Sequence, residues 1–121
     1  MIHEAIYSIL KTVEAKCYPG AVEQEDPPPW IIHRQLGLTP HPSKDGASKD
    51  DWLDYQIGYW AETKAEVQTM AAAGRAILDE YKGIIDGLVI EKIRITDQKS
   101  DFDDASNLYA ILQNYKIWIK I

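Results

Sequence analysis

The chain has 121 residues, one cysteine and a net charge of −6, and 45% of its residues are hydrophobic. This length and apolar content suit one globular domain with a modest core, and the lone cysteine, Cys17, excludes an internal disulfide framework and a cysteine zinc site. The acidic balance argues against an open nucleic-acid-binding face, which needs clustered Lys and Arg, but it suits a channel that DNA slides through without adhering.

The first predicted element is an amphipathic helix over residues 2–15. Its apolar residues recur at spacings of three and four, which places them on one stripe of a helix. These residues are Ile2, Ala5, Ile6, Ile9, Leu10 and Val13. Tyr18-Pro19-Gly20 is then expected to end the helix and turn the chain.

An acidic, proline-rich segment over residues 21–29 leads into the first predicted strand. Its three consecutive prolines, residues 27–29, favour an extended polyproline conformation and remove three hydrogen-bond donors. Two interpretations are open: a recognition segment for a partner's aromatic groove, or a stiff lead-in to an edge strand, which is the more usual role. The strand itself is predicted over residues 30–36, where Trp30 begins an apolar run.

A polar stretch over residues 37–51 separates this strand from the next one. A hairpin needs only about two to five loop residues, and a longer structureless loop in a small domain is usually functional or disordered. We therefore predict a single domain over residues 1–121 that carries a flexible insert at 37–51. Such an insert is the kind of segment that folds against a neighbouring molecule.

The clearest strand is predicted over residues 52–60, where apolar and polar residues alternate. Leu53, Tyr55, Ile57 and Tyr59 point to one face, and Asp54, Gln56 and Gly58 point to the other. One face is therefore expected to be buried, and the other to be wet or to contact a partner.

The second helix is predicted from a capping box at Thr63 and Glu66 to about Lys82, with Gly83 as its C-terminal cap. In a capping box the Thr hydroxyl accepts a hydrogen bond from the Glu amide, and the Glu side chain returns to the Thr amide. The expected core stripe consists of Val67, Met70, Ala71, Gly74, Ile77, Leu78 and Tyr81.

A third strand is predicted over residues 87–97, followed by an acidic turn at 98–105 and a last strand over 106–121. In the third strand Val89, Ile93 and Ile95 share one face, and Lys92 and Arg94 share the other. These two cations are either simple exposed charges or salt-bridge partners across an interface.

The last strand is the longest, and it has the same alternation. Tyr109, Ile111, Tyr115, Ile117, Ile119 and Ile121 share one face, and Asn114, Lys116, Trp118 and Lys120 share the other. The predicted fold class is α+β in the order α-β-β-α-β-β, with helices packed on one face of a mostly antiparallel four-stranded sheet.

The sequence contains no catalytic set, so we predict that the protein is not an enzyme and needs no cofactor or metal. The acidic turn, with Asp101, Asp103 and Asp104, departs from the calcium-loop pattern, which requires Gly where Ser106 stands and Glu where Leu112 stands. The histidines, His3, His33 and His41, lack metal-ligand spacing. The chain has no apolar run long enough to span a membrane and no basic segment at its start, which predicts a soluble, cytoplasmic protein.

Several segments, taken in order, resemble the tail-completion proteins of long-tailed phages, also called tail-to-head joining proteins, whose fold is similar to that of phage tail terminators. The segments are the helix Glu4–Leu10, Tyr18-Pro19-Gly20, the strand start Pro29–Ile32, the loop Pro42–Gly46, the strand-to-helix junction from Asp54 to Glu66, and the closing strand from Leu108 to Trp118. Together they cover nearly the whole chain. The acidic turn at 101–104 departs from the family's pattern.

The resemblance implies a structural virion protein that forms a homo-oligomeric ring, expected to be a hexamer, at the head-proximal end of the tail. Such a ring ends growth of the tail tube and docks to the head connector or head-closure protein, and its subunit can be a monomer when free. The resemblance places the protein in the virion, and in the host cytoplasm during assembly. DNA would pass through an acidic lumen without specific binding, and no membrane is involved.

A ring needs two different complementary patches on each subunit, since its contacts are heterologous. The candidate interface residues are Pro42, Lys44, Asp45, Asp54, Gln56, Trp60 and Trp118. The alternative function is a small cytoplasmic α+β ligand-binding or regulatory domain whose pocket is lined by Tyr55, Tyr59, Trp60 and Trp118. A metal-dependent hydrolase that uses the acidic turn is the weakest of the three interpretations.

Overall fold

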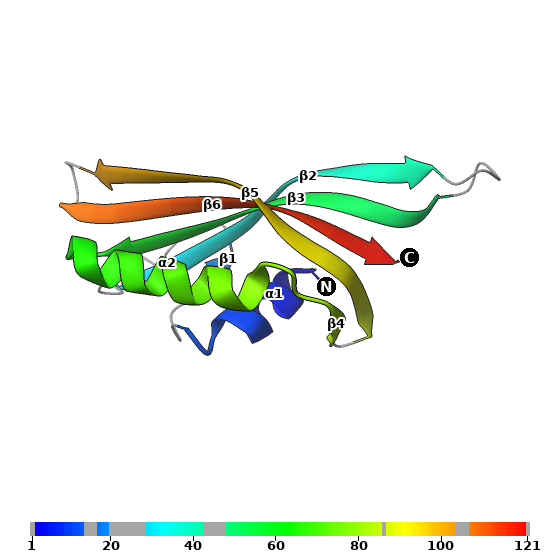
Figure 1. Cartoon of the computed structure of the whole chain (residues 1–121), viewed down its shortest axis with the longest axis horizontal. Helices are drawn as coiled ribbons and strands as arrows, with labels where there is room; N and C mark the ends of the chain where they lie inside the picture. The colour runs from blue at the N-terminus through cyan, green and yellow to red at the C-terminus, as the bar shows by residue number, and fades with distance from the viewer. Residues whose placement is uncertain are drawn as a thin grey trace.

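The computed structural model describes residues 2–13, 17–19, 29–42, 48–85, 87–103 and 107–120, and of residues 3, 18, 19, 38–42, 48–51 and 103 it describes only the backbone. The elements are α1 (Ile2–Leu10), β1 (Cys17–Pro19), β2 (Trp30–Pro42), β3 (Ser48–Ala61), α2 (Lys64–Leu78), β4 (Gly83–Ile85), β5 (Leu88–Asp103) and β6 (Leu108–Lys120). The strands form one twisted sheet in the order β1-β2-β3-β6-β5-β4, with α1 and α2 on the same side of it (Figure 1).

The prediction of a mostly antiparallel α+β fold is confirmed, but the number of strands, four, is wrong. The sheet has six strands, because two three-residue strands extend its edges. β1 pairs in parallel with Ile31–His33 of β2, so the chain after α1 runs along the sheet where a turn was expected at Tyr18 and Pro19. β4 pairs with the start of β5. Strands this short carry no readable alternation, which is why the sequence pattern missed them.

The first helix is shorter than predicted, and it ends at Leu10, where a span to residue 15 was expected. Its apolar stripe is confirmed. The buried members are Ile2, Ala5, Ile6, Ile9 and Leu10, with Val13 partly buried against the same core. Residues 14–16 lie outside the described part of the chain.

The polar stretch at 37–51 is mostly strand, which corrects its interpretation as a structureless loop. β2 runs on to Pro42 and β3 begins at Ser48, with Thr39 opposite Trp52 and His41 opposite Asp50. Backbone hydrogen bonds in an antiparallel pair do not require an apolar side chain, so the hairpin continues past the residues that face the core. Residues 43–47 lie outside the described part, and whether this arm is flexible stays a prediction.

One of the two hydrogen bonds of the predicted capping box is confirmed, because the Glu66 amide donates to the Thr63 hydroxyl at 3.2 Å. The predicted end of the helix is wrong. The helix ends at Leu78 with Asp79 as its cap, and Glu80 rather than a glycine takes a positive φ of 67°. The chain leaves the helix early because it hydrogen-bonds to the edge of β5. The Glu80 amide donates to the Ile93 carbonyl at 2.7 Å, and an Asp79 carboxylate oxygen accepts from the Ile95 amide at 3.1 Å.

The predicted acidic turn is also largely strand. β5 continues to Asp103, and its end pairs with the start of β6, with Asp101 opposite Ala110 and Phe102 opposite Tyr109. Residues 104–106 lie outside the described part. As in the other long hairpin, backbone pairing extends beyond the apolar alternation, so a polar sequence was mistaken for a turn.

The core lies between the helices and one face of the sheet, and it contains three tyrosines that are fully or almost fully buried: Tyr55, Tyr59 and Tyr115. The Tyr59 ring packs against the backbone of α2 at Gly74, where a Cβ would overlap the tyrosine hydroxyl. The close approach of helix and strand therefore depends on this glycine. The predicted core stripe of α2 is confirmed at Val67, Met70, Ala71, Gly74 and Leu78, with Ile77 and Tyr81 packed against its edge.

One fully buried polar residue, Gln113 of β6, lies on the core face of the sheet. Its amide nitrogen donates to the Ala71 carbonyl of α2 at 3.1 Å and to the Gln98 side chain at 2.9 Å. Its oxygen accepts the hydroxyl of Tyr115 at 2.6 Å. These hydrogen bonds satisfy Gln113 in the interior and link the helix to β5 and β6.

Candidate functional site

The face of the sheet opposite α1 and α2, called the open face below, is uncovered by any described element (Figure 1). Along β3 and β6 the core-facing residues alternate with the open-face residues, as expected for strands with one buried face. The open-face residues of the two central strands are Trp52, Asp54, Gln56 and Trp60 on β3 and Leu112, Asn114, Lys116 and Trp118 on β6. The two ends of the open face, on either side of its middle, carry different kinds of side chain.

The middle of the open face is a polar ladder across three strands. Arg34, Gln56 and Asn114 lie opposite one another in the registers of β2, β3 and β6. The Arg34 Nε donates to the Gln56 Oε1 at 3.1 Å, and the Gln56 Nε2 donates to the Asn114 Oδ1 at 3.2 Å. The ladder uses the hydrogen-bonding groups of Gln56 within the subunit, so this part of the face is pre-ordered rather than free to rearrange.

At one end of the ladder the open face carries a group of Trp and cationic residues. We call Trp52, Lys92, Arg94, Lys116 and Trp118 the cationic Trp face. The two indoles pack edge to face, with ring centroids 5.8 Å apart. The Lys116 ammonium lies 4.8 Å from the centre of the Trp52 ring, and that of Lys92 lies 6.0 Å from the centre of the Trp118 ring. Cation–π contacts of this kind hold the lysine side chains against the aromatic surface.

Among the described side chains, none forms an ion pair with Lys92, Arg94 or Lys116. Lys116 lies directly opposite Arg94 on one side and Asp54 on the other. Among the described side chains the ion pair found is Lys99–Asp97, at 3.9 Å, and it lies elsewhere on β5. Like charges directly opposite one another, such as Arg94 and Lys116, destabilise a sheet, whereas unlike charges in that position, such as Asp54 and Lys116, stabilise it.

At the other end of the ladder the open face is apolar. The Trp60 ring lies over Gly58, where a Cβ would overlap the indole, and it lies close to Leu112. Ile32 and Leu112 help to line a shallow cavity of about 270 Å³ beside the indole. A half-buried Trp beside an unfilled depression is typical of positions that contact a partner.

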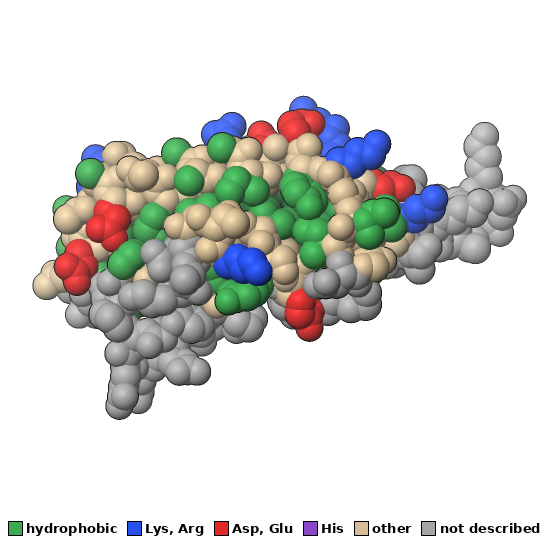
Figure 2. Space-filling view, turned by 90° about the horizontal axis from the view of Figure 1, so that it is seen from below, with side chains coloured by type: hydrophobic (Ala, Val, Ile, Leu, Met, Phe, Trp, Pro, Cys, Tyr) green, Lys and Arg blue, Asp and Glu red, His purple; other side chains and the backbone are tan. Residues whose placement is uncertain are grey.

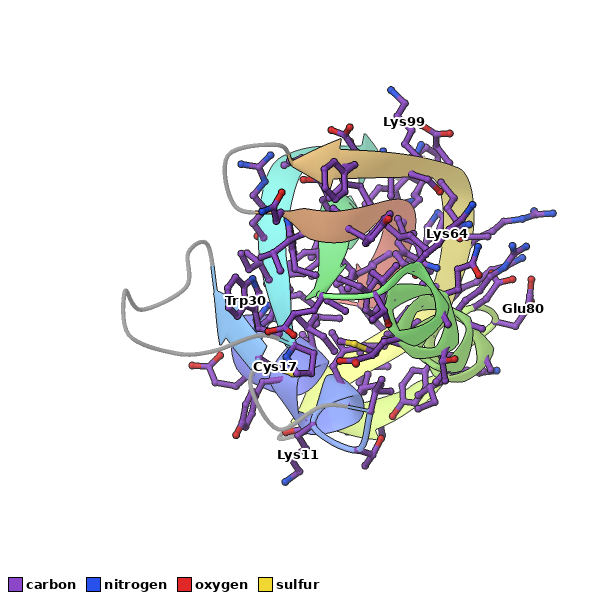
Figure 3. The ribbon with its side chains drawn as sticks, turned by 90° about the vertical axis from the view of Figure 1, so that its left-hand side faces the viewer. Lys11, Cys17, Trp30, Lys64, Glu80 and Lys99 are labelled. Carbon is purple, nitrogen blue, oxygen red and sulfur yellow. The ribbon has the colours of Figure 1, made fainter. Side chains whose placement is uncertain are left out.

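The side that α2 covers is different, with hydrophobic atoms along its middle and charged side chains mostly around them (Figure 2). A groove of about 330 Å³ lies between the start of α2 and the β5–β6 hairpin, and Lys64, Asp101, Phe102 and Tyr109 help to line it. Phe102 is 40% exposed and packs on Tyr109 with ring centroids 4.8 Å apart. Figure 3 shows the molecule from the left-hand side of Figure 1. In this view Lys99 of β5 points away from the sheet, whereas Cys17 lies in the interior near Trp30.

The structure brings four of the seven predicted interface residues onto one face. Asp54, Gln56, Trp60 and Trp118 all lie on the open face, Asp54 exposed and the other three partly buried. Pro42 ends β2, and only its backbone is described, while Lys44 and Asp45 lie outside the described residues. The alternative pocket is wrong in its geometry. Tyr55 and Tyr59 face the core, whereas Trp60 and Trp118 face the opposite side, so the four residues do not line one pocket.

Trp52 and Lys116 were not singled out in the sequence, although both belong to the cationic Trp face. Trp52 shares the phase of Asp54 and Gln56, so the alternation of β3 could have placed it on the same face. Its pairing with Trp118 could not be predicted, because it depends on the register of two strands far apart in the sequence. Lys92 and Arg94 were correctly placed on one face, and the interface role considered for them stays open.

The buried histidine and the three buried tyrosines lie in the core of the protein. The His33 Nδ1 lies 2.7 Å from the Tyr55 hydroxyl in the core. Burial, and secondly the charge of Glu4, raises the pKa of Tyr55; burial also raises the pKa of Tyr59 and Tyr115. These phenols therefore stay protonated well above their usual range. Among the described residues no group of three His, Cys, Asp or Glu side chains is placed to hold a metal, and none of the described helices is long and apolar enough to cross a membrane.

A family model described as "Tail completion protein gp17" matches residues 4–120. The chain belongs to this tail completion protein family. The match spans both long hairpins, nearly all of both helices and the open face. It confirms the resemblance drawn from the ordered segments of the sequence, and it makes the protein a structural component of a bacteriophage tail.

A solved structure titled "Virion of native gene transfer agent (GTA) particle" contains a chain of similar fold. The TM-score is 0.67 at 12% sequence identity, and the match covers 94% of this chain and 86% of that one. At this identity the likeness shows a shared fold. No curated protein matches the sequence.

Proposed function

We propose that this tail completion protein forms a ring at the head-proximal end of the phage tail, where it ends growth of the tail tube and docks to the head connector. The observation that carries the proposal is the open face, an uncovered sheet surface with three partly buried Trp side chains. Trp residues in a partly desolvated setting are typical anchors of protein interfaces. The family match supports a place in the tail, and the ring and its position are our inference.

The subunit offers separate surfaces for the different contacts that this role requires. A closed ring needs two complementary patches, and joining head to tail needs two more. We propose Asp54, Gln56, Trp60 and Trp118 as interface residues, with the paired strand ends of the β2–β3 arm, residues 37–42 and 48–51, as a further contact with a neighbour. Equal protease resistance of this arm in the free subunit and in joined tails would contradict that contact.

The role is structural rather than enzymatic, and the subunit can exist as a monomer until a tail is present. We propose assembly in the host cytoplasm and a lumen that is acidic overall, which lets DNA pass without adhering. Tight binding of the assembled ring to duplex DNA at about 0.15 M salt would contradict an acidic lumen.

The test uses particles of the phage that encodes the protein, made without it and then supplied with purified subunit. We expect electron microscopy to show heads and tails that remain separate without the protein, and joined particles after it is added. Light scattering coupled to size exclusion should show the monomer peak moving onto tails. Heads and tails that join normally without the protein would overturn the proposal.

A further inference from the structure

The sheet has an outer edge on each side, and the two edges are protected from further pairing to different degrees. β1 and β4 are short, and each pairs with only three residues of the strand beside it. Beyond His33 the outer edge of β2 pairs with no described strand, but Pro40 and Pro42 remove two amide donors from it. Short strands and prolines protect a sheet edge from pairing with another chain. The second half of β5 contains no proline and has no short strand beside it.

The first half of the outer edge of β5 is occupied within the chain. The Ile93 amide donates to the Tyr81 carbonyl at 3.2 Å, and the Ile93 carbonyl accepts the Glu80 amide at 2.7 Å. The Ile95 amide donates to the Asp79 carboxylate at 3.1 Å. Backbone groups of alternate residues in an antiparallel strand point to opposite sides. These bonds therefore identify the core-facing residues of β5 as those whose backbone groups point away from β6.

The second half of this edge, Gln98–Phe102, pairs with no described strand. The Phe102 amide donates to the Asp101 carboxylate at 2.8 Å, in agreement with an outward direction. Gln98 and Ser100 share the alternation of Phe102, so their amides and carbonyls also point outward. The charged side chains of this stretch alternate with these residues and lie on the open face, which leaves the helix side of the edge uncharged.

A groove runs between this edge and α2. Cavities of about 330 and 260 Å³ follow each other along it, and Gln68, Ser100 and Ile111 line both of them. In Figure 3 Lys64, which also lines the larger cavity, lies between the ribbons of α2 and β5. Because α2 packs mainly on β3 and β6, the side chains of Gln98–Phe102 are all exposed. The unpaired backbone groups therefore border an open groove.

The two cavities suit different side chains. The larger one is lined by Val67, Phe102 and Tyr109, and the two charged residues beside it have opposite signs. Among the described residues that line the smaller one, Arg75 carries the charge. Side chains two residues apart on an extended strand point to the same side, about 7 Å apart. A strand added to β5 would therefore place an apolar side chain in the larger cavity and an acidic one, two residues along, beside Arg75.

We propose that the groove between α2 and the end of β5 binds an extended segment of another virion protein, which adds a strand to β5 and carries an apolar and an acidic side chain two residues apart. In strand addition, main-chain hydrogen bonds supply affinity and pockets for alternate side chains supply specificity.

The partner is a different protein because the described part of a second copy offers no suitable segment. Its unpaired edges are those of two three-residue strands and of a strand with two prolines. The proposal rests on the joining function proposed above, which places the partner in the virion.

The experiment adds variants that block the groove to heads and tails made without the protein. Gln68→Trp fills the point where the two cavities meet, and Ser100→Pro removes an amide that points away from β6. Each should lower the number of joined particles by about tenfold or more. Thr69→Trp, at an exposed neighbour that lines neither cavity, is the matched control and should join particles as the wild type does. Circular dichroism checks that each variant is folded.

Two measurements on joined particles identify the contact. The amides of Gln98 and Ser100 should exchange hydrogen about tenfold more slowly, or slower still, than in the free subunit, because they become bonded to the added strand. A photo-cross-linking label on Thr69→Cys should attach to an acidic segment of another virion protein. Cys17 is buried and should stay unlabelled. If Ser100→Pro does not fold, the exchange measurement decides the strand pairing.

Each outcome decides the proposal. Loss of joining in both blocking variants, slowed exchange and a cross-link to another virion protein support it. Loss in Gln68→Trp with unchanged exchange at the β5 edge overturns the strand addition. Folded blocking variants that join particles like the wild type overturn the groove and leave the joining function standing. A cross-link to a second copy of this chain overturns the partner. Heads and tails that join without the protein overturn the joining function and this proposal together.

Discussion

Ile117 and Trp118 are neighbours on β6, yet they lie on faces of the sheet with different properties. Ile117 is buried in the core beneath the helices, whereas Trp118 lies on the open face, with the Lys92 ammonium 6.0 Å from the centre of its ring. The core face holds three buried tyrosines and a fully hydrogen-bonded glutamine. One strand therefore serves two purposes: its core-facing residues determine stability, and its open-face residues are available for assembly.

Alkaline pH should have the largest effect on the free energy of unfolding. This effect comes from the core face, because the buried phenols all lie there. The pKa values of Tyr55, Tyr59 and Tyr115 are raised in the fold, so their contribution to stability is complete below the unfolded-state pKa of about 10 and is lost as pH rises above it. Above about pH 10 three protons leave the unfolded chain first. The free energy of unfolding should then fall by about 4 kcal/mol per pH unit.

Urea titrations between neutral and alkaline pH measure this slope. A Tyr115→Phe variant removes one phenol and should lower the slope by about a third. A free energy of unfolding that is unchanged across this range would contradict the burial of the three phenols.

Truncating a side chain on the core face should lower the free energy of unfolding by more than truncating one on the open face. Ile117→Ala leaves a cavity in the core and should lower the free energy of unfolding by about 2–5 kcal/mol. Trp118→Ala, one residue away, should lower it by only about 1 kcal/mol, the value of the lost Trp52 contact. Urea denaturation compares the two variants directly. A larger loss of stability for Trp118→Ala than for Ile117→Ala would reverse the assignment of the faces.

The contact between α2 and the core face can be tested at Gly74. A Cβ there overlaps the Tyr59 hydroxyl and lies 2.7 Å from the ring carbon that bears it, so Gly74→Ala should destabilise by about 1–3 kcal/mol despite the better helix propensity of Ala. In the double variant with Tyr59→Phe, part of the loss should be recovered. A stabilising Gly74→Ala would show that the helix lies farther from β3 than described. Ala76→Gly, at an exposed position of the same helix, controls for propensity alone.

The polar ladder of the open face should contribute least to stability. Gln56→Ala breaks two hydrogen bonds between partly exposed groups, and the expected change is about 0.5 kcal/mol or less. Its effect on binding to tails should be larger than its effect on unfolding. A loss of stability similar to that of Ile117→Ala would mean that the ladder belongs to the folding core.

Which of these features the sequence could predict depends on the range of the interaction. The buried stripes of α1 and α2 and the alternation at Leu53 and Tyr55 follow from local periodicity, and the structure has them as predicted. The outer halves of both hairpins could not be predicted. There, at Thr39 and Asp101 for example, backbone pairing holds strands whose side chains look like those of a loop.

The residues of the candidate site also fall into two groups: those whose positions local alternation predicts, and those whose contacts depend on pairing between distant strands. Local alternation places Asp54 and Gln56 on one face, and the same rule places Lys92 with Arg94. The Trp52–Trp118 contact and the opposition of Arg94 and Lys116 need the register between β3, β6 and β5, which only the folded sheet fixes. The end of α2 was missed because Asp79 and Glu80 bond to β5, an interaction with no local signal.

The role of the open face in assembly is tested by adding Trp118→Ala subunit to tails and heads made without the protein, and by counting joined particles by electron microscopy beside the wild type. We expect a variant that is folded and nearly as stable as the wild type, yet does not attach to tails or join them to heads. A folded variant that joins heads to tails as well as the wild type would contradict the assignment of the open face to assembly.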